Sequence, residues 1–236
     1  TGAKTTYQYD GKGQLLSSTD GNGNTTAVAY DGNGNVISVT DGEGRQVRYA
    51  YDLADRLTEA MAGDASYENR NTYTYDEVGN LTSTTDGNGN KMTYTYDLLS
   101  NQTSRTNALG ETESYSYNLN NRLEKITRPN GNTIQYDYNK LDALLQTDYS
   151  EEADGQVLYT YDEEGKRLSM SDLTGTSTYQ YDADGRITGV QQGDGSVILY
   201  NYDSYGNLAK LIYPDGSEVQ YEYDALDRLI KDRLYL

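Results

Sequence analysis

The sequence predicts an all-β protein made of tandem antiparallel β-hairpin repeats that form a curved or spiralling single-layer sheet. Three observations predict this fold. A Tyr-x-Tyr-Asp motif returns about every 21 residues, two turn signals follow each copy, and no apolar stripe of helical period persists. The chain has 26 Tyr and no Phe. We therefore expect tyrosine pairs across neighbouring strands to replace an aliphatic core.

The tyrosines of the motif recur in register along the chain. Eleven copies of Tyr followed by Asp or Asn recur in register, mostly 21 residues apart, and another Tyr stands two residues earlier in every copy except one, where Val28 takes its place. Residues two apart in a strand lie on the same face, so both rings of a motif should share one side of the sheet. The expected structural ladder consists of Tyr49, Tyr51, Tyr73, Tyr75, Tyr94, Tyr96, Tyr115, Tyr117, Tyr136, Tyr138, Tyr159, Tyr161, Tyr179, Tyr181, Tyr200, Tyr202, Tyr221 and Tyr223.

The first turn of each repeat follows the second tyrosine. The residue four positions later is Gly in six copies and Asp, Asn or Ser in the other five. All but Ser are residue types that readily adopt a positive φ. Two residues further on, nine copies have an aliphatic residue, and Gln102 and Arg167 replace it in the other two. The motif Asp is expected to accept hydrogen bonds from the turn amides.

A second turn closes each repeat. Asp-Gly or Asn-Gly, the strongest short hairpin signals, occur at residues 20–21, 41–42, 86–87, 130–131, 154–155, 194–195 and 215–216. Pro129 and Pro214 stand just before two of these dipeptides, where proline sets φ at the first corner of a turn. Three extra residues before Tyr75 predict a longer loop around residues 63–71.

The regularity continues from one end of the chain to the other. It predicts one domain of eleven repeats over residues 1–236, and because Thr1 falls inside a repeat, we expect the chain to be a fragment of a larger protein. A single hairpin cannot bury its apolar face alone, so neighbouring repeats must stack. The terminal strands are left without a neighbour on one side, which favours edge-to-edge self-association.

Charge and composition narrow the function classes. The net charge is −18, and the chain has no Cys and no His. Disulfides and thiolate metal sites are therefore excluded, and the commonest general base is missing. Negative charge disfavours nucleic acid, whose phosphates bind Lys and Arg clusters, and no apolar run is long enough for membrane insertion. We expect no cofactor.

The segment Tyr181-Asp182-Ala183-Asp184-Gly185-Arg186-Ile187 closely resembles the YD/RHS repeats. These repeats occur in bacterial Rhs and wall-associated polymorphic toxins, in the B/C components of Tc toxins and in teneurins, and the resemblance covers essentially the whole chain. It implies a hairpin strip that spirals into a hollow shell, which encloses a C-terminal toxin or presents a cell-surface scaffold. Toxin-bearing members end in a core with an Asp-Pro motif for self-cleavage. No Asp-Pro occurs here, so those residues are not carried over.

The expected function is a non-catalytic structural segment of such a shell, in a secreted or cell-surface bacterial protein. Its expected partners are the remainder of the parent shell and an enclosed C-terminal toxin domain. One alternative is an adhesion module that binds a glycan or receptor, because Tyr offers an apolar face and a hydroxyl group. The tyrosines outside the ladder that suit this alternative are Tyr67, Tyr149, Tyr205, Tyr213 and Tyr235. A weaker alternative is a carboxylate-based hydrolase among the 37 acidic residues.

The sequence contains candidate ligands for one metal, calcium. Asp-x-Asn-x-Asn, which spaces oxygen ligands like the start of a calcium loop, occurs three times. The residues are Asp20, Asn22 and Asn24, then Asp31, Asn33 and Asn35, then Asp86, Asn88 and Asn90. The bidentate acid expected at the twelfth position of such a loop is absent. Hairpin turns favour the same residue types, so these segments are interpreted as turns.

Overall fold

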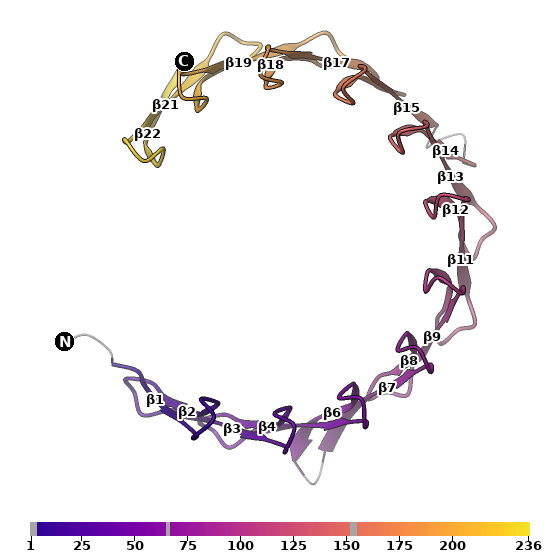
Figure 1. Ribbon diagram of the computed structural model, residues 1–236, viewed down its shortest axis with the longest axis vertical. Helices are drawn as coiled ribbons and strands as arrows, with labels where there is room; N and C mark the ends of the chain where they lie inside the picture. The colour runs from indigo at the N-terminus through magenta and orange to yellow at the C-terminus, as the bar shows by residue number, and fades with distance from the viewer. Residues whose placement is uncertain (1–3, 65–66, 152–154) are drawn as a thin grey trace. The chain divides into compact units, whose positions relative to one another are not determined.

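The computed structural model describes residues 4–64, 67–151 and 155–236. Over these residues the chain consists of strands and turns without a helix, which confirms the predicted all-β class. Within the described segments, no helix therefore has the length and apolar character needed to cross a membrane. The chain divides into two compact units, residues 1–114 and 115–236. Each unit by itself is a curved strip of antiparallel strands (Figure 1).

Within each unit, the strands follow one another in chain order, and consecutive strands pair antiparallel. The first unit contains β1 (Thr6–Tyr9), β2 (Leu15–Thr19), β3 (Thr25–Tyr30), β4 (Val36–Thr40), β5 (Gln46–Tyr51), β6 (Leu57–Asp64), β7 (Tyr67–Tyr75), β8 (Leu81–Thr85), β9 (Lys91–Tyr96) and β10 (Gln102–Thr106). The division between the units falls inside β11 (Thr112–Tyr117). The second unit continues with β12 (Leu123–Thr127), β13 (Thr133–Tyr138), β14 (Leu144–Tyr149), β15 (Gln156–Tyr161), β16 (Arg167–Asp172), β17 (Gly175–Tyr181), β18 (Ile187–Gln191), β19 (Val197–Tyr202), β20 (Leu208–Ile212), β21 (Glu218–Tyr223) and β22 (Leu229–Tyr235).

The pairing inside a repeat is illustrated by β7 and β8. Tyr73 lies opposite Thr84, and Tyr75 lies opposite Leu81, with a register shift between them that leaves Thr82 as an extra, bulged residue. The bulge keeps the second tyrosine and the aliphatic residue on the same face despite the five-residue turn between their strands. We call this the tyrosine face. The same shift occurs in β1–β2, β3–β4, β5–β6, β9–β10, β13–β14, β15–β16, β17–β18, β19–β20 and β21–β22.

The first turn has the predicted geometry in all eleven repeats. In the fifth repeat, the Ser100 amide donates to the Asp97 carbonyl at 3.1 Å, and the Asp97 amide donates to the Asn101 carbonyl at 2.9 Å. The residue four positions after the second tyrosine has a positive φ even where it is not glycine. Those non-glycine residues are Asp55, Ser100, Asn121, Asp142 and Asp227, with φ between 56° and 63°.

The second turns lie where the Asp-Gly and Asn-Gly signals predicted them, except at residues 154–155, where Asp154 lies outside the described residues. The two glycines of an Asp-Gly-x-Gly segment have different tasks. Gly44 and Gly89 have the positive φ, at 83° and 84°. Gly42 and Gly87 are needed for a close approach, because a Cβ on Gly42 would lie 2.9 Å from Asn24 Cβ. In the turn that contains Pro129, proline occupies the predicted first corner, and the Gly131 amide donates to Arg128 O at 2.9 Å.

The prediction of a loop at residues 63–71 is wrong. β6 and β7 pair without interruption from Glu59 opposite Thr72 to Asp64 opposite Tyr67, so the inserted residues lengthen a hairpin. β6 and β7 are each three residues longer than β8 and β9, so both strands are extended by the same number and the two-residue alternation of the side chains continues across the pair. Residues 65–66 of the predicted loop lie outside the described residues. Sequence reasoning failed because the insertion contains Gly63 and polar residues that also suit a loop.

Because the sheet is a single layer, few side chains are buried. The buried side chains of the described residues are those of Ile134, Ser83 and Thr147. Most ladder tyrosines are half-buried against their neighbours on the tyrosine face. Cross-strand contacts within the layer therefore provide the packing that a second layer would provide in a sandwich.

In nine of the eleven motifs, the second tyrosine hydrogen-bonds to the preceding repeat. The β8–β9 ladder that joins two repeats has three residue pairs, from Ser83–Thr93 to Thr85–Lys91. Beyond it, the Tyr96 hydroxyl donates to the Leu81 carbonyl at 2.8 Å. Equivalent bonds of 2.8–3.0 Å join Tyr30 to Leu15, Tyr51 to Val36, Tyr75 to Leu57, Tyr138 to Leu123, Tyr161 to Leu144, Tyr181 to Arg167, Tyr202 to Ile187 and Tyr223 to Leu208. Phenylalanine could not make this bond, which accounts for tyrosine at this position.

Removing one of these hydroxyls should destabilise the fold. Tyr96→Phe deprives the Leu81 carbonyl of this donor, and we expect the free energy of unfolding to fall by about 1 kcal/mol. Tyr94→Phe is the matched control, because Tyr94 lies on the same strand and its hydroxyl makes no hydrogen bond within the described residues. Urea unfolding followed by circular dichroism measures both effects. Equal losses in the two variants would contradict the role assigned to Tyr96.

Candidate functional site

The motif aspartates serve the first turns. Asp97 Oδ1 accepts hydrogen bonds from the backbone amides of Leu99 and Asn101 at 2.8 and 2.9 Å, and Asp97 Oδ2 accepts one from Asn101 Nδ2 at 2.9 Å. The Asn101 side chain contributes most to lowering the pKa of Asp97, followed by the Asn101 amide. Both oxygens of the carboxylate are thus occupied by hydrogen bonds that hold the turn closed.

The calcium candidates form the same kind of turn. Asp20 Oδ1 accepts the amides of Asn22 and Asn24 at 2.8 and 2.9 Å, and its Oδ2 accepts Asn24 Nδ2 at 2.9 Å. The same three bonds occur in the turns of Asp31 with Asn33 and Asn35 and of Asp86 with Asn88 and Asn90. Within the described segments, no group of three or more acidic side chains is placed to hold a metal ion.

Calcium should therefore have little effect on stability. Metal binding would have to displace turn hydrogen bonds from Asp20 and Asp86, so we expect millimolar calcium to shift the thermal unfolding midpoint no more than the same concentration of magnesium. Differential scanning calorimetry with and without a chelator measures this. A calcium-specific rise that Asp86→Asn removes would show that the turn interpretation is incomplete.

Acid should weaken the fold through these carboxylates. Their folded-state pKa values are lowered, so their contribution to stability is present above the unfolded pKa and is lost as the pH falls through the folded pKa. We expect the urea midpoint to fall between neutral pH and about pH 3. Asp97→Asn should fold at neutral pH, because Asn118 holds the equivalent turn with its own Oδ1. The variant should lose less stability in acid, and a loss at least as large as that of the unmodified chain would contradict the argument.

A second set of carboxylates joins the first turns of neighbouring repeats. Asp55, at a φ of 58°, accepts Asn33 Nδ2 at 2.8 Å and Asn35 Nδ2 at 2.7 Å from the preceding repeat. Asn207 Nδ2 donates to Asp227 Oδ1 at 2.8 Å in the same way. These contacts offset the steric cost of a positive φ at Asp. Our sequence reasoning interpreted these Asp residues only as turn formers; the signal was an Asn about 20 residues earlier.

Cations at the end of the first turn reach the next repeat. The Arg56 guanidinium lies 4.8 Å from the centre of the Tyr75 ring, and Arg186 lies 4.8 Å from that of Tyr202. Arg56 also pairs with Asp52 at 2.7 Å. Such cation–π contacts add to the hydrogen bonds between repeats.

The tyrosines predicted for glycan binding do not gather at one place. Tyr205 is 85% exposed on the turn between β19 and β20, whereas Tyr149 is half-buried at the end of β14. Tyr213 follows β20, and Tyr235 ends β22. The structure does not describe the side chain of Tyr67. The structure thus places these candidates on separate elements.

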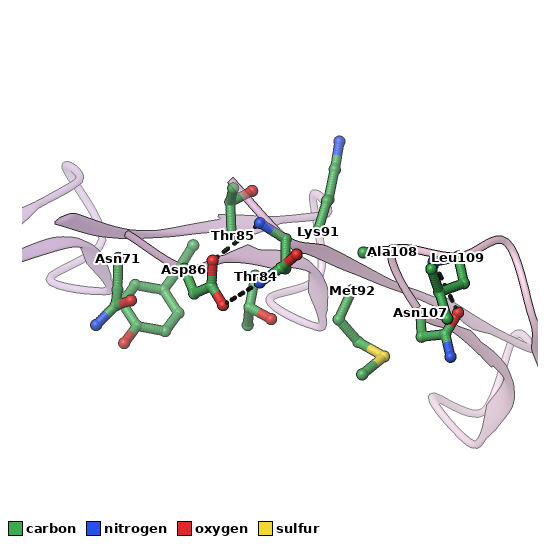
Figure 2. A pocket seen from close by; sticks show the side chains of 11 residues that line it. Asn71, Thr84, Thr85, Asp86, Lys91, Met92, Asn107, Ala108 and Leu109 are labelled. Atoms are coloured by element: carbon green, nitrogen blue, oxygen red, sulfur yellow. Dashed lines mark hydrogen bonds between the residues drawn. The ribbon is translucent and has the colours of Figure 1, made fainter. Parts of the chain in front are cut away.

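A groove that sequence reasoning missed lies on the tyrosine face of the first unit. It has a volume of about 510 Å³ and is bounded by the turns that start at Asp86 and Asn107. Asn71, Tyr73, Thr84, Met92 and Leu109 also line it. Figure 2 shows the side chains of Asn71, Thr84 and Met92 on one side of the sheet, and those of Thr85 and Lys91 on the other. We call this depression the Asn71 groove.

Comparison with known families identifies the repeat. Residues 30–64, 75–112, 161–197 and 199–233 match the family model described as RHS Repeat. These stretches cover more than half of the chain and contain most of the Tyr-Asp motifs. The chain belongs to the RHS repeat family.

Solved structures of Tc toxins share the fold. The chain is similar to the Photorhabdus luminescens Tc holotoxin pore, with a TM-score of 0.68 and 16% identity over 97% of this chain and 15% of that one. Crystal structures of TcdB2-TccC3-Cdc42 and of TcdB2-TccC3 without its hypervariable C-terminal region give TM-scores of 0.65 and 0.64, each at 16% identity over 96% of this chain and 16% of theirs. The chain thus spans about 16% of the matched chains. No curated protein matches the sequence.

Proposed function

We propose that the chain is a non-catalytic structural segment of an RHS/YD shell that encapsulates or presents a toxin or effector in a secreted or cell-surface bacterial protein. The observation that carries the proposal is the bond that joins the second tyrosine to the preceding repeat in nine of the eleven motifs. Repeated along an RHS chain, it supports a wall of indefinite length without a second layer. The fold that the chain shares with Tc toxin structures supports the same role.

The partners in this proposal are the remainder of the parent shell and an enclosed C-terminal toxin domain. The matched Tc toxin chains are much longer than this one, which suits a segment of a larger wall. The exposed edge strand β22 has unpartnered apolar side chains, with Leu229 53% and Ile230 62% exposed. A further hairpin of the parent shell, or the edge of a second copy, would cover them.

A non-catalytic role is supported by how the acidic side chains are used. The motif aspartates hold turns, and Asp55 and Asp227 join neighbouring repeats, so these carboxylates already have structural partners. A catalytic acid–base pair needs a shaped site in which the pKa of one carboxyl group is raised. The carboxyl groups with resolved shifts among the described residues have lowered pKa values instead.

Protection of an adjoining domain tests the shell proposal. In the full-length protein that contains this chain, we expect the non-repeat effector domain to resist limited proteolysis while the wall is folded. Tyr96→Ala combined with Tyr202→Ala removes two ring contacts and two bonds to the preceding repeats, and should expose the effector. Tyr205→Ala is the control, because that side chain projects from a turn.

Mass spectrometry of the digest identifies the fragments. Faster cleavage of the effector in the double variant than in the control supports enclosure. Equally fast cleavage in the unmodified protein and both variants contradicts enclosure and leaves presentation on the outside of the wall.

A further inference from the structure

The first turns of the third, fourth and fifth repeats expose large apolar side chains at their tips. Leu53 and Leu98 are fully exposed, and Val78 and Leu99 are 79% and 71% exposed. Each stands at the second or third residue of its turn. The same two positions are Gly-Lys at residues 11–12 and Glu-Glu at residues 163–164, and those turns close with the same backbone hydrogen bonds. The turn therefore does not require an apolar residue at its tip.

These tips follow one another along one edge of the first unit. Consecutive antiparallel strands place alternate turns at opposite edges, so the first turns all share an edge. Neighbouring first turns also touch, because Arg56 Nη1 donates to the Asp76 carbonyl of the next repeat at 3.0 Å. Successive tips are two strands apart, which corresponds to about 9–10 Å. We call Leu53, Val78, Leu98 and Leu99 the apolar tip row.

The edge that bears the apolar tip row is acidic. The three turns, at residues 52–56, 76–80 and 97–101, contain five carboxylates and one cation, Arg56. Arg56 pairs with Asp52 at 2.7 Å, and the other four carboxylates form no ion pair with any residue that the structure describes. Glu77 is exposed directly beside Val78. Exposed apolar side chains are thus surrounded by uncompensated negative charge.

The spacing of the tips matches a helix better than a strand. Residues seven apart in an α-helix lie on one face and are about 10.5 Å apart along its axis. Residues on one face of a strand repeat at about 6.8 Å, which does not match the tips. The acidic surroundings disfavour an anionic membrane surface, and they disfavour a second copy of this chain, whose net charge is −18.

We propose that the apolar tip row binds a basic amphipathic helix of a partner protein. The helix lies across the ends of the strands, and an apolar residue at every seventh position contacts one tip after another. Lys or Arg side chains beside that stripe face carboxylates such as Asp55 and Glu77, which also favour rapid association. This surface goes beyond the structural role and does not depend on it.

A synthetic helix tests the proposal on the intact chain. The probe has about three heptads, with leucine at every seventh position, lysine on either side of it and alanine elsewhere. Calorimetry should show saturable binding, and Leu53→Ser combined with Leu98→Ser should raise the dissociation constant at least about tenfold. Both side chains are fully exposed, so the fold should persist, and circular dichroism verifies it. Leu109→Ser is the matched control, because Leu109 is 83% exposed but lies on a second turn at the opposite edge.

Two further comparisons separate a helix site from charge or lipid binding. Glu77→Gln should weaken binding of the probe at low salt and have less effect at high salt. A peptide of the same composition in scrambled order should bind more weakly than the probe. The proposal is overturned if the probe does not bind, if the scrambled peptide binds equally well, or if Leu109→Ser weakens binding as much as the double variant. Binding of the chain to vesicles of pure phosphatidylcholine through Leu53 and Leu98, without binding of the probe, would identify a lipid-binding edge instead.

Discussion

The hydrogen bond from the second tyrosine of a motif to the preceding repeat is the contact on which the rest of the structure depends. Most ladders between repeats are short; that of β8 and β9 has three residue pairs, and the Tyr96 hydroxyl satisfies the Leu81 carbonyl beyond its end. The ring and the hydroxyl of one residue thus serve packing and polar satisfaction together. A single layer that buries so few side chains needs both, because it has no second sheet to cover its apolar face.

The two tyrosines of a motif have different tasks. Tyr75 and Tyr96 bond to the preceding repeats, whereas the Tyr73 and Tyr94 hydroxyls make no hydrogen bond within the described residues. The hydroxyls of Tyr73 and Tyr94 are therefore not needed to join neighbouring repeats.

Sequence reasoning predicted the strands, the first turns and the shared tyrosine face, because these follow from local periodicity and from residues that tolerate a positive φ. It was wrong about residues 63–71, where glycine and polar residues occur in a lengthened hairpin as readily as in a loop. It also missed the link from Asn33 to Asp55 and the Asn71 groove. Both depend on which turns and strands of neighbouring repeats lie side by side, which no single motif reveals.

The bond between Tyr96 and Leu81 spans 15 residues, and its counterparts span 14 to 18. The repeats that make this bond therefore contact their predecessors by the same local rule, wherever they stand in the chain. A gene that gains or loses one whole repeat by unequal recombination keeps all these bonds, whereas a cut within a repeat breaks one. The length of such a wall can thus change by whole repeats without the loss of these bonds.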